Sequence, residues 1–62
     1  MVKIKSKIGR EYSVETTDKD VCIIYDVTNP LDKKFVSVYC GYENETEENM
    51  KCINDYEKSL CL

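Results

Sequence analysis

Four cysteines, Cys22, Cys40, Cys52 and Cys61, are the residues of this 62-residue chain with the most versatile chemistry. Cysteine thiolates hold zinc when they come in closely spaced pairs, often with histidine. Here 17, 11 and 8 residues separate successive cysteines, and the chain contains no histidine. A cysteine nucleophile likewise needs a neighbouring base, usually histidine. The spacing therefore predicts no metal site, no other cofactor and no thiol catalysis.

The same thiols have two further interpretations, as disulfides or as buried reduced cysteines. Closing a loop of this length adds about 2–4 kcal/mol to a small core, whereas free cysteine in a reducing compartment acts as a small hydrophobe. A hairpin symmetric about Leu31 places Cys22 opposite Cys40. Cys52 and Cys61 lie nine positions apart, about 13.5 Å along a helix, which is too far for a bond. If two bridges form, we expect them to join sheet to helix.

Charge is divided between the two ends of the chain, whose net charge is −3. Residues 1–19 carry five basic and three acidic groups, whereas residues 43–62 carry two basic and six acidic groups. Adjacent carboxylates such as Glu47 and Glu48 can serve acid–base catalysis. In a first helical turn, however, they ordinarily remain solvated and favour the helix dipole. We therefore predict a protein that is not an enzyme.

Alternating apolar and polar residues predict two N-terminal strands, over residues 2–8 and 11–16. A two-residue Gly9-Arg10 loop would place Ile8 opposite Glu11 and mix apolar with charged residues on one face. A three-residue loop, Ile8-Gly9-Arg10, instead sets Ile4 opposite Val14 and places Lys3 and Lys7 opposite glutamates. We therefore predict the three-residue loop.

Two more strands are predicted over residues 21–25 and 35–42, joined through a turn at Asn29-Pro30-Leu31-Asp32. Both carry apolar residues on both faces. Such a pattern fits a sheet that curls toward a partial barrel, or a sheet whose second face is an interface, including one with a second copy. The pattern alone does not distinguish the two.

A C-terminal helix is predicted to begin at Asn44 as N-cap, with Glu47 completing a capping box. At 100° per residue, Ile53, Tyr56 and Leu60 form the buried stripe, flanked by Met50, Cys52 and Cys61. The whole chain is thus expected to be one domain, residues 1–62, of class α+β: a four-stranded antiparallel sheet with one helix on one face.

The leading functional hypothesis is an interaction module that docks on a basic, nucleic-acid-binding surface of a protein partner. In class it resembles the small inhibitors that phages and viruses encode against host proteins. The docking residues are expected at the acidic end and on two aromatic side chains: Glu43, Glu45, Glu47, Glu48, Asp55, Tyr39 and Tyr42.

Two alternatives remain. Lys3, Lys5 and Lys7 could meet nucleic-acid phosphates while tyrosines stack on bases, although Glu11 and Glu15 neutralise part of that face. A secreted, disulfide-stapled domain is the other. The N-terminus lacks the apolar core of a signal peptide, and no apolar run approaches the ~20 residues of a membrane span. We therefore expect a cytoplasmic protein without membrane contact, and the inhibitor hypothesis implies the cytoplasm of an infected cell.

Overall fold

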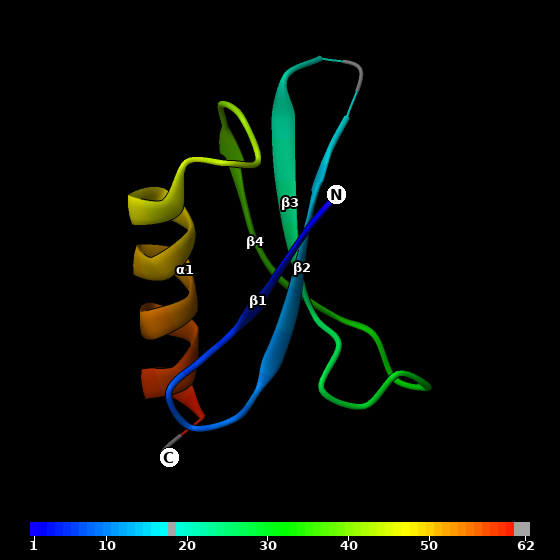
Figure 1. The fold of residues 1–62 in the computed structure, drawn as a ribbon, viewed down its shortest axis with the longest axis vertical. Helices are drawn as coiled ribbons and strands as arrows, with labels where there is room; N and C mark the ends of the chain where they lie inside the picture. The colour runs from blue at the N-terminus through cyan, green and yellow to red at the C-terminus, as the bar shows by residue number, and fades with distance from the viewer. Residues whose placement is uncertain (18, 61–62) are drawn as a thin grey trace.

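The protein, described by a computed structural model over residues 1–17 and 19–60, forms four strands and one helix. The strands are β1 (Val2–Lys5), β2 (Glu11–Thr16), β3 (Val21–Asp26) and β4 (Lys34–Cys40), and the helix is α1 (Thr46–Ser59). Neighbouring strands pair antiparallel in one open sheet of order β1-β2-β3-β4, and α1 lies along one face of it (Figure 1). The predicted α+β class and ββββα order are confirmed.

The core lies between α1 and the sheet face that it covers, here called the inner face. Strand alternation sends every second side chain to this face. Tyr12, Val14, Cys22 and Ile24 from the sheet are fully buried against Ile53 of the helix. Burying each large apolar side chain contributes about 1.5–3 kcal/mol, so the helix stabilises the sheet by covering this face.

The first hairpin has a three-residue loop, but its register differs from the prediction by two residues. Ile4 pairs with Tyr12, and Val2, not Ile4, pairs with Val14. The loop is Lys7-Ile8-Gly9, closed by the Ser6 N–H donating to the Arg10 carbonyl. Gly9 has φ +84°, and three-residue hairpin loops place their left-handed residue last. Since glycine must take that third position, it sets the register.

The second hairpin keeps the predicted turn but not the predicted symmetry about Leu31. The Asp32 N–H donates to the Asn29 carbonyl over 2.9 Å, as the turn requires. A β-bulge at Val36 then shifts the register, so Cys22 pairs with Tyr39 and Cys40 with Val21. Paired residues share a face of the sheet, whereas residues adjacent along a strand point to opposite faces. Cys40, which is adjacent to Tyr39, therefore points away from the face of Cys22. The expected Cys22–Cys40 juxtaposition is therefore wrong: Cys22 is buried and Cys40 is exposed.

The helix begins one residue later than predicted. Glu45, not Asn44, is the N-cap residue, and no side-chain hydrogen bond caps the helix. The Glu45 carboxylate instead accepts a bond from the Tyr42 N–H. Asn44 is wrong as a cap because the chain turns through residues 41–45 before the helix begins, with the Glu45 N–H donating to the Tyr42 carbonyl.

The buried stripe of the helix contains Asn49 and Ile53. Tyr56 packs at its edge, whereas Leu60, expected within the stripe, is 36% exposed. Asn49 is only 1% exposed. Its side chain can be buried because its amide group donates to the Glu43 carbonyl over 2.8 Å and its amide oxygen accepts from the Tyr39 hydroxyl. Cys61, predicted at the edge of the stripe, lies outside the described residues.

The opposite face of the sheet, here called the outer face, carries no helix within residues 1–17 and 19–60. The sheet is open rather than barrel-like, since β1 and β4 are its two edges. Phe35 and Val38 are 60% and 51% exposed. The apolar residues on the second face are therefore solvent-facing, as expected for the interface alternative.

We predict that Gly9→Ala lowers the free energy of unfolding by about 1 kcal/mol. A Cβ at Gly9 would meet no atom within 4 Å, so the cost is backbone strain at positive φ alone. Urea unfolding of wild type and variant measures it. Gly9→Asn is the matched control, since asparagine tolerates this conformation. Equal destabilisation by both variants would contradict the register argument.

Candidate functional site

The acidic end of the molecule, defined as Tyr42, Glu43, Glu45, Glu47 and Glu48, joins the end of β4 to the first turn of α1. Glu45, Glu47 and Glu48 are exposed and line one surface hollow with Thr46. Tyr42 is 65% exposed and lines the adjoining hollow with Glu43. Five of the seven predicted docking residues therefore lie together.

Within residues 1–17 and 19–60, Glu43 is the one member of the acidic end that has a cationic partner. The Met1 amino group donates to Glu43 Oε1 over 3.0 Å, and the Thr16 hydroxyl donates to Oε2 over 3.1 Å. These bonds, the first from the N-terminus and the second from Thr16, lower the pKa of Glu43. Glu43 is therefore ionised, and its negative charge is partly balanced by the N-terminal amino group.

Glu47 and Glu48 differ from Glu43 because the ion pairs found within residues 1–17 and 19–60 involve neither of them. Both lie in the first turn of α1, where the helix dipole favours negative charge. They are the most available carboxylates of the acidic end.

Asp55, also predicted as a docking residue, lies apart from the acidic end. It is exposed two turns further along α1. Lys51 and Lys58, four residues before it and three after it, share its helix face. Lys51 lies between Asp55 and Glu48 along this face, so the structure does not join Asp55 to the acidic end.

Tyr39 is half-buried and serves the core. Its hydroxyl donates to Asn49 and lies 3.1 Å from the Tyr42 carbonyl, and its ring packs against the core cluster. Burial, followed by the neighbouring Cys22, raises the pKa of Tyr39. It therefore stays protonated at neutral pH and ties β4 to α1, while Tyr42 is the exposed aromatic of the pair.

The outer face holds a row of side chains that sequence reasoning did not assemble. Lys3, Ser13, Tyr25 and Phe35 are successive partners across all four strands. Lys33 Nζ lies 4.1 Å from the centre of the Tyr25 ring, a cation–π contact. The apolar residues on both faces of the third and fourth predicted strands indicated this face, but the row itself depends on the register of the strands.

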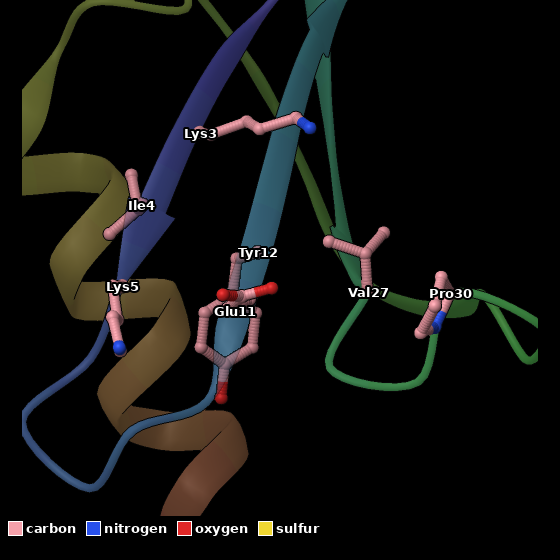
Figure 2. A pocket seen from close by; sticks show the side chains of 7 residues that line it. All are labelled: Lys3, Ile4, Lys5, Glu11, Tyr12, Val27 and Pro30. Atoms are coloured by element: carbon pink, nitrogen blue, oxygen red, sulfur yellow. The ribbon is translucent and has the colours of Figure 1, made fainter.

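Lys3 and Lys5 project from β1 beside a surface hollow lined also by Glu11, Val27 and Pro30. Figure 2 shows Lys3 extending across β2, away from α1, whereas Ile4 points toward the helix. Lys7, predicted with these two lysines on one strand face, lies in the hairpin loop instead. Of the three lysines predicted on one strand face, β1 therefore presents only Lys3 and Lys5.

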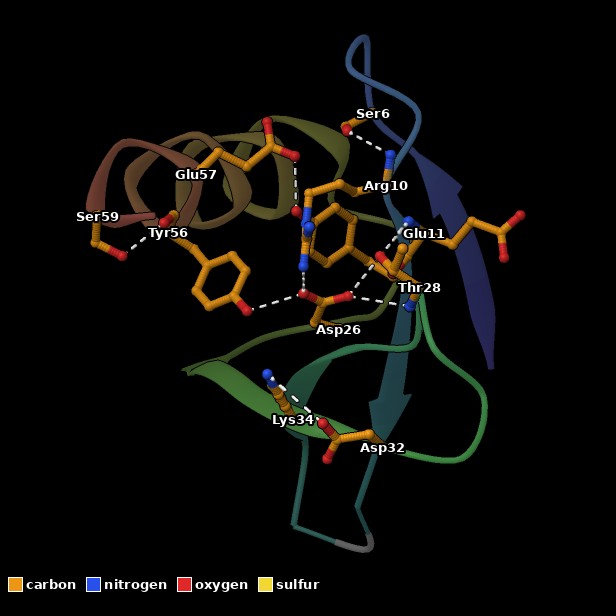
Figure 3. A network of polar contacts seen from close by, with 11 residues as sticks. Ser6, Arg10, Glu11, Asp26, Thr28, Asp32, Lys34, Tyr56, Glu57 and Ser59 are labelled. Atoms are coloured by element: carbon orange, nitrogen blue, oxygen red, sulfur yellow. Dashed lines mark hydrogen bonds and ion pairs between the residues drawn. The ribbon is translucent and has the colours of Figure 1, made fainter. Parts of the chain in front are cut away.

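A buried polar network joins the sheet to the helix, and its centre is Asp26, which is 2% exposed (Figure 3). Arg10 donates to Asp26 Oδ2, as does the Tyr56 hydroxyl over 2.8 Å. The hydroxyl and the N–H of Thr28 both donate to Oδ1. The carboxylate thus receives four hydrogen bonds from three separate segments.

A second carboxylate, that of Glu57 in α1, extends this network. The Tyr12 hydroxyl donates to Glu57 Oε2 over 2.6 Å, and the Tyr12 and Tyr56 rings meet edge to face, with centroids 6.1 Å apart. Burial, then the bond to Glu57, raises the pKa of Tyr12. Tyr12 is therefore a neutral hydrogen-bond donor beneath the helix.

The network is built for stability rather than proton transfer. Burial alone would raise the pKa of Asp26, but the bonds from Thr28 and Arg10 outweigh it and hold the pKa well below its usual range. A general base needs a pKa near the working pH. The Asp26 carboxylate is far less basic than that and stays ionised at neutral pH.

The three cysteines within the described residues do not gather into a reactive group. Cys22, Cys40 and Cys52 carry free thiols. The buried Cys22 thiol donates to the Gly41 carbonyl over 3.1 Å. Across the described part of the chain, no three cysteine, aspartate or glutamate side chains are arranged to hold a metal ion.

We predict that Tyr56→Phe lowers the free energy of unfolding at pH 7 by about 1–2 kcal/mol, because one bond to the charged Asp26 is lost while the ring remains. The pKa of Asp26 is depressed in the folded state, so the stability from this group is present above about pH 4 and declines as pH falls below it. Chemical unfolding from pH 7 to pH 3 measures both effects.

The gap between wild type and Tyr56→Phe should stay constant from pH 7 to well below pH 4 and narrow only where the variant's folded Asp26 takes up its proton. The two unfolded chains titrate alike, so the decline below about pH 4 is common to both and cancels from the difference. Tyr42→Phe is the control, because Tyr42 is an exposed tyrosine outside the network. A gap that already narrows between pH 7 and pH 4, where Asp26 is ionised in both folded chains, would show that Asp26 is not the group involved.

No helix described here has both the length and the apolar character needed to cross a membrane. Comparisons with protein-family models, curated proteins and solved structures found no match to this chain. Two surfaces thus stand as candidates for function, the acidic end and the outer face of the sheet.

Proposed function

We propose that this protein is a non-enzymatic interaction module whose acidic end binds a basic surface of a protein partner. The observation that carries the proposal is the combination of Glu47 and Glu48, exposed and without a cationic partner within the described residues, with the exposed ring of Tyr42. Aromatic residues are enriched at protein interfaces, and charge complementarity steers association.

The fold supports this surface by holding its parts in place. The Glu45 carboxylate fixes the Tyr42 N–H, and Asn49 holds the Glu43 carbonyl from within the core. The segment between β4 and α1 is therefore tied down at both ends. A pre-organised surface loses less conformational entropy on binding than a flexible one.

The partner we propose is a protein whose basic surface normally holds nucleic acid. Closely spaced carboxylates beside an aromatic ring offer such a surface the negative charge and the flat group that phosphates and bases offer. By occupying it, the protein acts as an inhibitor, within the cytoplasm where such partners are found. No catalytic step is needed for this role.

We predict that Glu47→Lys with Glu48→Lys weakens partner binding at least about tenfold and makes the remaining binding less sensitive to salt. Asp55→Lys with Glu11→Lys is the matched control, because it changes the net charge equally at exposed positions away from the acidic end. Immobilised wild type and both variants are compared for the proteins that they retain from a host-cell lysate.

The expected partner is retained by wild type and by the control, lost from the Glu47/Glu48 variant, and eluted by added nucleic acid. Isothermal titration of the purified partner at several salt concentrations then gives the affinities. If all three chains retain the same proteins with the same affinity, the acidic end is not the docking surface.

A second candidate function rests on the row Lys3, Ser13, Tyr25 and Phe35 of the outer face. The aromatic pair consists of the exposed Phe35 and the half-buried Tyr25. Aromatic side chains next to lysines are an arrangement on which single-stranded nucleic acid stacks. Glu11 and Glu15 lie on the same face, and Lys33 is already paired with Glu15 over 3.0 Å. The acidic end therefore remains the better supported surface.

For this second function, we predict that wild type binds a fluorescent single-stranded oligonucleotide at low salt and that Phe35→Ala weakens binding about tenfold, the loss of one stacked base. Leu31→Ala is the control, since Leu31 is 95% exposed in the hairpin loop, away from the row. Fluorescence anisotropy measures the affinities, and an unchanged signal with wild type at low salt rules the function out.

A further inference from the structure

The two edge strands of the sheet differ in how they resist association. Natural edge strands avoid pairing with other chains by being short and by carrying lysine. β1 has only four residues, two of which are lysines. β4 has seven residues, and no residue from Phe35 to Cys40 is charged. Its bulge at Val36 interrupts only the first half of the strand. β4 is therefore the less protected edge.

The backbone of β4 is open on the side away from β3. Within residues 1–17 and 19–60, the backbone hydrogen bonds outside the helix and the strand ladders involve no residue of Lys34–Cys40. The outer face beside this edge is apolar, with Phe35 and Val38 more than half exposed and Cys40 also exposed. An added strand would satisfy the backbone groups and extend the apolar face.

Charge flanking β4 specifies which strand fits this edge. Lys33 and Lys34 precede the uncharged run, and Glu43 and Glu45 follow it. An antiparallel strand with the same flanks brings its acidic end to the lysines and its basic end to the glutamates. A parallel strand would bring like charges together. The strand that meets both requirements is β4 itself, in a second copy related by a two-fold axis.

We propose that this protein forms a symmetric dimer in which β4 pairs antiparallel with β4 of a second copy, with Val38 close to the two-fold axis. The two four-stranded sheets become one continuous sheet. Lys33 and Lys34 of each copy lie near Glu43 and Glu45 of the other. The present ion pairs of the lysines, Lys34 with Asp32 and Lys33 with Glu15, are between exposed side chains and weak, and Lys33 also lies over the Tyr25 ring. The two glutamates keep their bonds within their own chain, Glu43 to Met1 and Thr16 and Glu45 to the Tyr42 N–H. The proposal is independent of the role of Glu47 and Glu48.

The first test is sedimentation equilibrium over a range of concentrations. Wild type should pass from the 7.2 kDa monomer to twice that mass. Val38→Lys should raise the dimer dissociation constant at least about tenfold, because two lysines then meet at the axis. Leu31→Lys is the matched control, an equal change at an exposed position outside β4, and should leave the constant unchanged.

The second test uses charge reversal and distinguishes the proposed pairing from non-specific apolar association. Lys33→Glu with Lys34→Glu places acid against acid in a homodimer, and Glu43→Lys with Glu45→Lys places base against base in its own homodimer. Each variant alone should dimerise less than wild type. A mixture of the two should form a heterodimer in which both charged junctions are attractive, detected by native mass spectrometry.

Two results would overturn the proposal. One is a wild-type mass that stays at that of the monomer at all concentrations, which would leave the β4 edge to a different partner. The other is a dimer that Val38→Lys and Leu31→Lys weaken equally, or that shows no preference for the charge-matched mixture.

Discussion

The buried carboxylate of Asp26 is the constraint on which the arrangement of the whole chain depends. An ionised group in a low-dielectric interior is stable only when donors surround it. Arg10, just before β2, Thr28, just after β3, and Tyr56 of α1 supply those donors. One charge thus fixes the relative positions of a hairpin loop, a strand end and the helix. Apolar packing alone would hold the same elements together with less specificity of position.

The same constraint explains why the two candidate surfaces lie where they do. The network draws the C-terminal half of α1 onto the sheet, and Asn49 secures its first turns through Tyr39 and Glu43. The solvated carboxylates then remain at the start of the helix, facing away from the core. Because one helix covers only one side of an open sheet, the outer face stays accessible. The functional surfaces are therefore what the packing of a small core leaves uncovered.

Local patterns of the sequence predicted the elements well. The alternation over residues 2–16, the apolar and β-branched runs over residues 21–25 and 35–42, and the periodicity around Ile53 depend only on neighbouring residues. The strands, the helix and their order could therefore be found. The registers of the two hairpins could not be predicted, because the first depends on the position of Gly9 within its loop and the second on the bulge at Val36. A one-residue shift there separates Cys22 from Cys40.

The candidate site shows the same division between local and distant contacts. Glu45, Glu47, Glu48 and Tyr42 are close in sequence, so their proximity could be predicted. The buried role of Tyr39 could not, since it requires Asn49, a helical residue whose polar type suggested exposure. The Arg10–Asp26 pair spans 16 residues and carries no motif. Contacts of that kind become visible only when the strands are aligned in space.

The order of the strands also has a consequence for how the chain is made. Each strand pairs with its neighbour in sequence, so the sheet closes through short loops at little entropic cost and should form early. The helix, which covers Tyr12, Val14 and Ile24, is synthesised after all four strands. Until it emerges from the ribosome, the nascent sheet exposes apolar side chains on both faces. A chain that stops short of α1 is therefore a substrate for chaperones and for aggregation, even though all of its strands are present.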